Sequence, residues 1–159
     1  ASTDFDSYLH GGDQEQKKRA GTENLPAIVG MVAALKDDLE NQAQNFEKVQ
    51  QLKDTFLKEM AETDYYLNQG KDQLPYVLNI GFPGQRNDLL LLRLDLEGIS
   101  ISTGSACTAG VVQVSHVLQA FYGEDSPRLH ESVRVSISPQ NTGQEIITLA
   151  QTLKEIIGG

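Results

Sequence analysis

The stretch YVLNIGFPG at residues 76–84 decides the fold. Its β-branched and aromatic residues favour a strand over 76–80, and the glycines and proline of GFPG end that strand in a turn. A second strand is predicted at 132–138, where apolar and polar residues alternate. Val133, Val135 and Ile137 point to one side of this strand, and Arg134 and Ser136 point to the other. Two such strands indicate a sheet with one buried face and one polar face.

Helical spacing of apolar residues surrounds these strands. It predicts one helix from Leu25, capped by Glu23 or Asn24, and a second helix over about 43–62. Further along, the pattern predicts a helix over 87–97 that Gly98 closes, a short strand at 99–102 and a helix over 114–122. A T-x-x-E capping box, Thr142 to Glu145, begins a last helix that ends at Gly158. The fold class is therefore α+β, with about three strands, helices packed on one face and a long helical arm in front.

The composition describes a globular chain and argues against several functions. Hydrophobic residues make up 39% and charged residues 22% of the 159 residues, which is enough apolar material for one core. A net charge of −9 argues against a surface that grips nucleic-acid phosphates. No apolar run reaches the roughly 18–20 residues that a membrane span requires. With one cysteine and no Cys/His cluster, we expect neither an internal disulfide nor a metal site.

Cys107 lies in the segment STGSACTAG, residues 102–110, where every neighbour is small. The segment follows a predicted strand and precedes a predicted helix, which places the thiol on a connecting loop, where functional groups concentrate. The glycines leave the backbone free and the small neighbours leave the thiol accessible. We therefore expect residues 103–112 to be mobile and Cys107 to be exposed. From these residues alone, an inert cysteine that fills a small apolar space is an open alternative.

Two further polar residues are candidate binding groups. Arg134, on the polar side of its strand, can hold a carboxylate by two parallel hydrogen bonds, and the alternative is a salt bridge. Thr22, in GTEN at 21–24, precedes a helix start, where backbone N–H groups and a hydroxyl bind anions; the alternative is a simple cap. None of the three histidines is spaced to pair with Cys107, which favours structural roles for His10, His116 and His130.

Three blocks of the sequence, taken together and in order, resemble the IscS/NifS-type cysteine desulfurases of the class-V aminotransferase family. HGGDQEQKKRAGTEN at 10–24 is similar to the family's HGGGQE…R-x-GTEN stretch, apart from Asp13, where the family usually has a third glycine. NIGFPG through LDLEGI at 79–99 is similar to the family's N-x-x-F-x-G…LD-x-x-G-I region. STGSACTAG, followed by SHVL at 115–118 and SVRVS at 132–136, is similar to the catalytic-cysteine loop and the substrate-arginine strand.

The resemblance implies an enzyme that uses pyridoxal 5′-phosphate (PLP) and assigns a role to three residues. Cys107 would take the sulfur of L-cysteine as a persulfide, with L-alanine as the other product. Arg134 would bind the α-carboxylate of the substrate. Thr22 would reach across a homodimer interface to the phosphate of the PLP held by the partner subunit.

The resemblance also indicates what this chain lacks. The family's PLP lysine lies in a Ser/Thr-rich turn and follows a histidine, and no lysine of this chain has that context. We therefore expect an inactive fragment without bound PLP, in agreement with a start that lacks Met. Residues 1–24 would end a truncated large PLP domain, 25–42 would be a connecting helix, and 43–159 would be the small C-terminal domain with the cysteine loop.

The resemblance further implies a cytoplasmic enzyme that passes sulfur to acceptor proteins, for iron–sulfur cluster assembly or tRNA thiolation. Neither nucleic acid nor membrane would be bound directly. Two alternatives stay open. A selenocysteine lyase or another class-V aminotransferase is disfavoured by the flank GSACTAG and by the long separation of Cys107 from the strand at 132–138. A non-catalytic module that docks sulfur acceptors would keep the fold without the chemistry.

Overall fold

The structure is a computed structural model that describes residues 6–70, 72–104 and 114–159. The chain forms two compact units, Ala1–Gln42 and Ala43–Gly159. One long helix, α2 (Leu25–Glu59), has residues in both units. Because the two units are separate bodies, each is described by itself.

The first unit contains a short turn of helix, α1 (Gln14–Lys17), and the N-terminal part of α2. Asn24 caps α2, as one of the two predicted caps, because its side-chain oxygen accepts a hydrogen bond from the Ala27 N–H at 3.2 Å. Apolar side chains repeat at helical spacing along this part of α2 and are 44–66% exposed. They are Leu25, Ile28, Val29, Met31, Val32, Leu35 and Leu39.

The prediction of two separate helices over 25–62 was wrong, because α2 is one helix that ends at Glu59. The physical reason lies in the junction at residues 40–45. It reads ENQAQN and contains neither glycine nor proline, so nothing in it breaks the backbone hydrogen-bond ladder. The polarity of the junction interrupted the apolar pattern without interrupting the helix.

The second unit is built on a three-stranded sheet in the order β1-β2-β3, with both pairs antiparallel. The predicted strands at 76–80 and 132–138 are confirmed as β2 (Val77–Gly81) and β3 (Ser132–Ser136). The third strand, β1 (Tyr66–Leu67), is only two residues long and was not predicted. The predicted strand at 99–102 forms a single bridge, in which Ser102 lies opposite Arg134.

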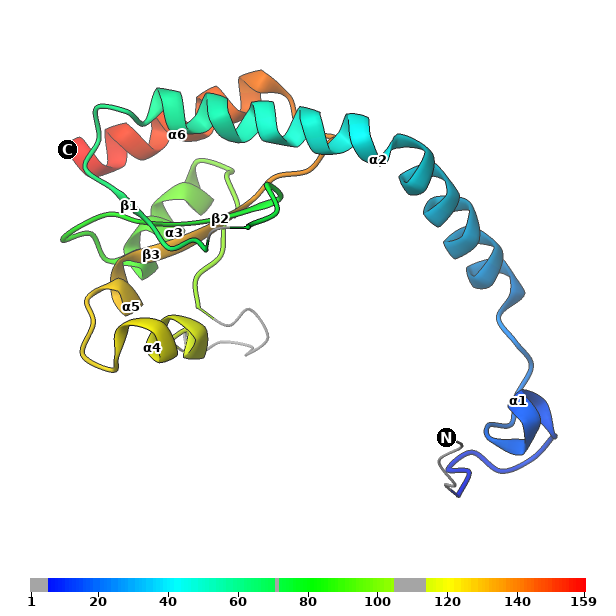
Figure 1. The fold of residues 1–159 in the computed structure, drawn as a ribbon. Coiled ribbons are helices and arrows are strands. Elements are labelled where there is room, and N and C mark those ends of the chain that lie inside the picture. The colour runs from blue at the N-terminus through cyan, green and yellow to red at the C-terminus, as the bar shows by residue number, and fades with distance from the viewer. Residues whose placement is uncertain (1–5, 71, 105–113) are drawn as a thin grey trace. The chain divides into compact units, whose positions relative to one another are not determined.

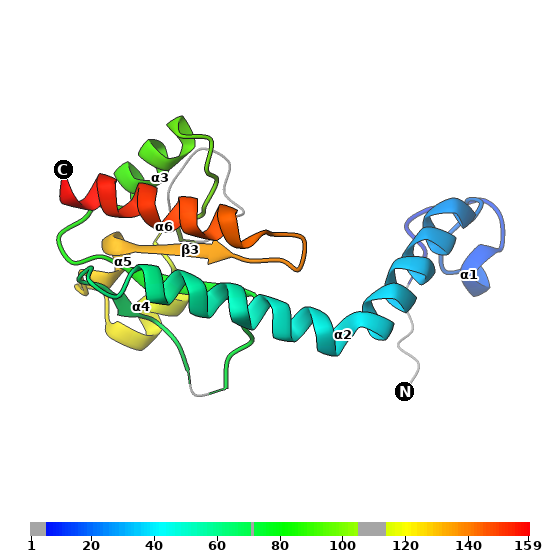
Figure 2. The same ribbon diagram turned by 90° about the horizontal axis from the view of Figure 1, so that it is seen from above.

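One face of the sheet is apolar and carries the core. Leu78 and Ile80 from β2 and Val133 and Val135 from β3 are at most 3% exposed. They pack against the C-terminal part of α2, α3 (Asn87–Leu96) and α6 (Gly143–Gly158). Figures 1 and 2 show α6 and this part of α2 running alongside the strands. The helices contribute buried Val49, Leu52, Phe56, Leu90, Leu94, Ile146, Leu149, Ala150, Leu153 and Ile156, and buried Met60 directly follows α2.

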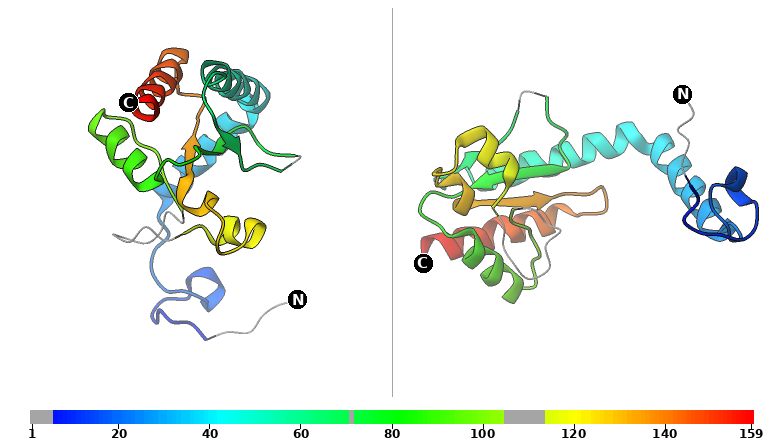
Figure 3. Two further views of the ribbon diagram at one scale, coloured as in Figure 1. Left: turned by 90° about the vertical axis from the view of Figure 1, so that its left-hand side faces the viewer. Right: turned by 90° about the horizontal axis from the view of Figure 1, so that it is seen from below.

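Two short helices lie on the other side of the sheet, whereas the prediction placed all the helices on one face. They are α4 (His116–Tyr122) and α5 (Arg128–Glu131), visible below the strands in Figure 1 and in the left panel of Figure 3. The predicted helix over 114–122 is confirmed as α4, whose first turn Ser115 caps by accepting from the Leu118 N–H. Within the described part of the chain, no helix is both long and apolar enough to cross a bilayer.

Candidate functional site

A row of polar side chains crosses the second face of the sheet. Asn79 of β2 lies directly opposite Arg134 of β3, and Ser102 lies opposite Arg134 on the other side. The row continues past Asn79, because the Asn68 N–H donates to the Asn79 carbonyl at 2.9 Å. Residues directly opposite one another in antiparallel strands point to the same face. Ser102, Arg134, Asn79 and Asn68 therefore form one line, here called the polar row.

Arg134 and Ser102 are joined by four hydrogen bonds, the longest of which runs from the Ser102 hydroxyl to the Arg134 carbonyl at 3.5 Å. The Arg134 N–H donates to the Ser102 carbonyl at 2.7 Å, and the Ser102 N–H donates back at 3.1 Å. The Arg134 Nε also donates to the Ser102 hydroxyl at 3.0 Å. Both residues are half-buried. The backbone and the near end of the guanidinium are thus held firmly against the strand segment that leads toward Cys107.

The terminal nitrogens of Arg134 have no partner among the described residues, and none of the ion pairs there involves this side chain. The other four arginines use theirs. Arg19 and Arg93 donate to backbone carbonyls, Arg86 pairs with Asp88, and Arg128 donates to Asn68. A half-buried guanidinium with its fork unused is an anion-binding group. Within the described residues, the structure does not support the alternative of an internal salt bridge for Arg134.

Arg128 occupies the far end of the polar row, where two aromatic rings and an amide oxygen contact its guanidinium. Its guanidinium carbon lies 4.1 Å from the centre of the Tyr66 ring and 4.5 Å from that of Tyr122. Its Nη1 donates to the Asn68 side-chain oxygen at 2.7 Å. Asn68 in turn donates to Asn79 and to the Ser132 hydroxyl, both at 2.8 Å. This end of the row therefore fastens α4 and α5 to the sheet and offers no free cation.

Tyr66 completes the same end of the row. Burial, with the Glu131 carboxylate beside it, raises the pKa of Tyr66 from its ordinary value of 10.0 to about 12. The phenol donates to Glu131 at 3.0 Å, and the other oxygen of Glu131 accepts from the Gly84 N–H at 2.8 Å. A Cβ placed on Gly81 would lie 2.2 Å from the Tyr66 ring. A glycine at position 81 thus leaves room for the ring of Tyr66, which packs from β1 against β2.

Thr22 lies in the first unit, exposed, two residues before the helix cap. Asn24 does the capping, so the structure does not support the reading of Thr22 as the cap. The hydroxyl of Thr22 has no hydrogen-bond partner among the described residues. The neighbouring Gly21 has a φ of +103°, a conformation that favours glycine, and its N–H donates to Gln14 at 3.2 Å. An exposed, unused hydroxyl next to a helix start fits a phosphate contact.

Cys107 itself lies outside the described residues. The expectations of an exposed thiol and of a mobile loop over 103–112 fall almost wholly on residues 105–113, which are also outside them. The described chain reaches Gly104, where φ is +54°, and resumes at Val114. The approach to the cysteine segment is therefore defined by the Ser102–Arg134 bridge, and its exit by the capped start of α4.

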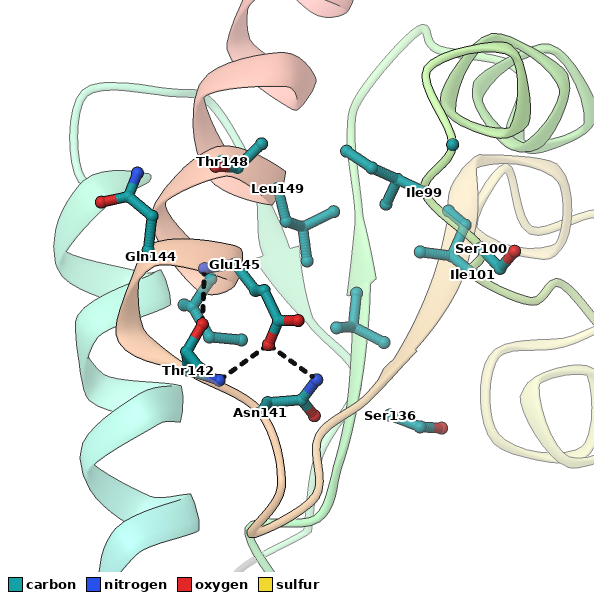
Figure 4. A pocket seen from close by; sticks show the side chains of 13 residues that line it. Ile99, Ser100, Ile101, Ser136, Asn141, Thr142, Gln144, Glu145, Thr148 and Leu149 are labelled. Carbon is teal, nitrogen blue, oxygen red and sulfur yellow. Dashed lines mark hydrogen bonds between the residues drawn. The ribbon is translucent and has the colours of Figure 1, made fainter.

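A pocket of about 420 Å³ lies between the segment 98–101 and the start of α6. Figure 4 shows that its polar side chains already bond one another. Glu145 accepts from the Thr142 N–H at 2.7 Å, and its own N–H donates to the Thr142 hydroxyl at 3.2 Å. These bonds confirm the predicted capping box. The Thr142 N–H and the Asn141 side-chain amide both donate to the Glu145 carboxylate and lower the pKa of this carboxyl. The helix start is thus occupied by its own side chains, which argues for a structural role.

Four of the lysines have partners in the structure. Among the described residues, Lys17, Lys36 and Lys154 form ion pairs with Asp13, Glu40 and Glu59, and Lys48 donates to the Pro139 carbonyl. None of these partners belongs to the polar row. In the same part of the chain, no three His, Cys, Asp or Glu side chains gather as a metal site would require. Arg134 and Thr22 fit the carboxylate-binding and phosphate-binding roles that the resemblance implies.

Several residues of this site were not identified from the sequence. In the sequence, Ser102 stands out only as a neighbour of the cysteine, Asn79 only as the first residue of the NIGFPG block, and Asn68 and Arg128 not at all. A signal existed for Asn79, because it stands between Leu78 and Ile80 at a polar position of an alternating strand. No comparable signal existed for Asn68, because β1 is too short to show a period.

Several known proteins are similar to this chain over most of its length. The class-V aminotransferase family model matches residues 2–149. The chain is 43% identical over 152 residues to the Bacillus subtilis protein IscS 1, covering 94% of this chain and 40% of the relative. It is 35% identical to the cysteine desulfurase IscS of Dictyoglomus turgidum, covering 98% and 40%. A NifS-like protein from Rickettsia africae matches with a TM-score of 0.81 and 27% identity, over 96% of this chain and 40% of that one.

The two curated relatives are thus much longer than this chain, which spans about 40% of their length. The match nevertheless runs through the polar row, the helical arm and the capping box of α6. A family model that covers nearly the whole sequence agrees with the α+β fold of the second unit and with the three sequence blocks. The chain belongs to the class-V aminotransferase family.

Proposed function

We propose that this chain is part of a PLP-dependent cysteine desulfurase and that Arg134 binds the α-carboxylate of L-cysteine. The observation that carries the proposal is the free fork of Arg134, held at the polar face of the sheet by Ser102. An amino acid substrate presents a carboxylate that such a fork grips with two parallel hydrogen bonds. The relative from Dictyoglomus turgidum, named a cysteine desulfurase, supports the choice of substrate.

Cys107 is the proposed sulfur acceptor. Its sulfur forms an S–S bond with the sulfur of the substrate, and the C–S bond of the substrate breaks with its electron pair left on carbon. A proton taken up at that carbon completes L-alanine, and Cys107 carries a persulfide. The overall reaction, cysteine plus thiol giving alanine plus persulfide, balances without an external oxidant. The nucleophile is the thiolate, so the segment has to keep Cys107 accessible.

PLP, when bound by a lysine elsewhere in the protein, supplies the electron sink that makes the bonds of the amino acid labile. In this chain, Thr22 is proposed to contact the phosphate of the PLP held by the partner subunit of a homodimer. The support is its exposed and unused hydroxyl at the helix start. A sulfur-acceptor protein would then take the persulfide, in the cytoplasm, for iron–sulfur cluster assembly or tRNA thiolation.

The decisive experiment replaces Cys107 by Ser in the complete protein that contains this chain. We expect cysteine to bind as before, while alanine formation and sulfur transfer are lost, because serine cannot accept the sulfur. Intact-mass spectrometry after incubation with L-cysteine should show one added sulfur atom on the unsubstituted protein and none on the variant. Normal turnover by Cys107→Ser would remove the acceptor assignment.

The chain by itself offers a second test. Because no lysine has the expected context, we expect it to retain no PLP after mixing and dialysis. Borohydride reduction followed by peptide mass spectrometry would reveal a lysine-bound cofactor. Stoichiometric labelling of a single lysine would show that this chain carries its own PLP anchor. It would contradict the proposal that a lysine elsewhere in the protein binds the cofactor.

A further inference from the structure

Ser102 uses up one specific side of the Arg134 guanidinium. The Nε donates to the Ser102 hydroxyl at 3.0 Å, while the two backbone bonds between these residues, at 2.7 and 3.1 Å, fix the strands that carry them. A guanidinium is planar and has one N–H on Nε and four on its terminal nitrogens. With Nε engaged, the edge that still offers two parallel N–H groups is the end formed by Nη1 and Nη2.

We infer that Ser102 is a positioning residue that turns this end of Arg134 toward the substrate carboxylate. The inference rests on the proposed function, because it assumes that Arg134 is the carboxylate site. A guanidinium free at both Nε and its terminal nitrogens can take a carboxylate along its side or at its end. The Ser102 hydroxyl occupies Nε and so prevents a carboxylate from binding along the side of the guanidinium. It also fixes side-chain χ angles of Arg134 that would otherwise have to be ordered when the substrate binds.

The neutrality of serine matters to this role. A carboxylate in place of the hydroxyl would form an ion pair with Arg134, as Asp88 does with Arg86 at 2.5 Å. Such a pair would compete with the substrate for the same fork. Ser102 instead accepts one hydrogen bond without neutralising the cation, so the charge of Arg134 stays available. We therefore expect Ser102→Asp to weaken cysteine binding more than Ser102→Ala does.

A double-mutant cycle in the complete enzyme tests the inference, with Ser102→Ala, Arg134→Lys and the pair. Ser102→Ala should raise KM for L-cysteine about 2- to 10-fold, the range of one modest hydrogen bond, and leave kcat nearly unchanged. Calorimetric binding of L-alanine, which has the carboxylate without the sulfur, should weaken by the same factor. Ser102→Thr keeps the hydroxyl and should restore both values. In the Arg134→Lys background, loss of the hydroxyl should have no further effect, because the two residues act as a unit.

The matched control is Ser136→Ala. Ser136 lies on the same strand and the same face, is exposed, and has no side-chain bond among the described residues. It should leave KM unchanged. Full, independent effects of Ser102→Ala and Arg134→Lys in the double variant would overturn the positioning role, as would an unchanged KM in Ser102→Ala. If Arg134→Lys alone leaves KM and L-alanine binding unchanged, the carboxylate assignment fails instead, whatever Ser102 does. Thermal melting of each variant separates these outcomes from loss of folding.

Discussion

The two faces of one small sheet are built for different purposes. On the apolar face, Leu78, Ile80 and Val133 are completely buried against three helices. On the polar face, the alternate residues of the same strands, Asn79 and Arg134, are half-buried and bonded in a row. Successive side chains of a strand point to opposite faces, so the same short strands carry both the apolar and the polar residues. The apolar face thus stabilises the fold, and the polar face carries the proposed binding residue.

The difference between the two faces shows how an arginine side chain can stay available for a ligand in a small folded unit. The apolar face supplies the burial that holds the strands in register, so the polar face does not have to be saturated. Arg128, at one end of that face, stacks between two rings and fastens α4 and α5. Arg134 lies a few residues away in the sequence, and its terminal nitrogens have no partner among the residues that the structure describes. Arg128 is structural, whereas Arg134 is the arginine proposed to bind the substrate carboxylate.

The largest effect is expected from breaking the apolar face. Phe56→Ala removes a fully buried ring from the core and should lower the free energy of unfolding by about 3–5 kcal/mol. Phe46→Ala on the same helix is the matched control, because Phe46 is 43% exposed and should cost no more than about 1 kcal/mol. Urea unfolding of the chain measures both. Equal losses would show that the burial difference does not govern stability.

A close approach on the polar face should give the next largest effect. In Gly81→Ala the added methyl would meet the Tyr66 ring, which has to shift. We expect a loss of about 1–3 kcal/mol, the usual cost of overpacking. Tyr66→Ala in the same background should relieve the clash, so that Gly81→Ala becomes nearly neutral there. A Gly81→Ala chain of normal stability would mean that β1 does not press onto β2.

The dependence of stability on alkaline pH tests the role of the Tyr66 phenol on the polar face. The folded pKa of Tyr66, about 12, lies above its ordinary value of 10.0, because burial disfavours the charged phenolate. The contribution of this group is therefore fully present below about pH 10 and is lost as the pH rises toward about 12. Unfolding midpoints across this range should fall less steeply for Tyr66→Phe than for the unsubstituted chain. Parallel slopes would remove Tyr66 as a source of the decline.

The smallest stability effect is expected at the binding arginine. Arg134→Lys should change the free energy of unfolding of the chain by no more than about 0.5 kcal/mol, because its side chain is half-buried and makes one side-chain bond. In the complete enzyme, the same variant should lose about 1.5–3 kcal/mol of cysteine binding. Val133→Ala, the neighbour on the other face, should do the opposite and affect stability first. A strongly destabilised Arg134→Lys would make this arginine structural, like Arg128.

The helical arm shows where sequence patterns mislead. Apolar spacing located the helical residues of α2 well, yet the polar junction at 40–45 suggested a break that the backbone does not have. Hydrogen bonding along a helix depends on local backbone freedom, and the apolar period reflects what each side of the helix packs against. Residues 25–39 are exposed and the apolar residues of 49–60 carry the core, although almost all of them belong to the same helix.

The sequence by itself determined the features that depend on neighbouring residues or on the alternation of apolar and polar residues. Strands β2 and β3, the faces of their side chains, the caps at Asn24 and Gly98 and the capping box of α6 all depend on residues close together in the chain. The resemblance to a family depends on the order of short blocks, and it assigned roles to Cys107, Arg134 and Thr22. For Arg134, the alternation of its strand was enough to place it on the polar face.

Tertiary structure alone decided which residues meet. The pairing of Ser102 with Arg134 joins positions 32 residues apart, and the bond between Tyr66 and Glu131 joins positions 65 apart. Strand register, set by the packing of the apolar face, brings them together, and no local pattern encodes that distance. Whether an arginine is saturated or free is likewise a property of its neighbours in space. The sequence could name Arg134 as a candidate, but only the fold distinguishes it from Arg128.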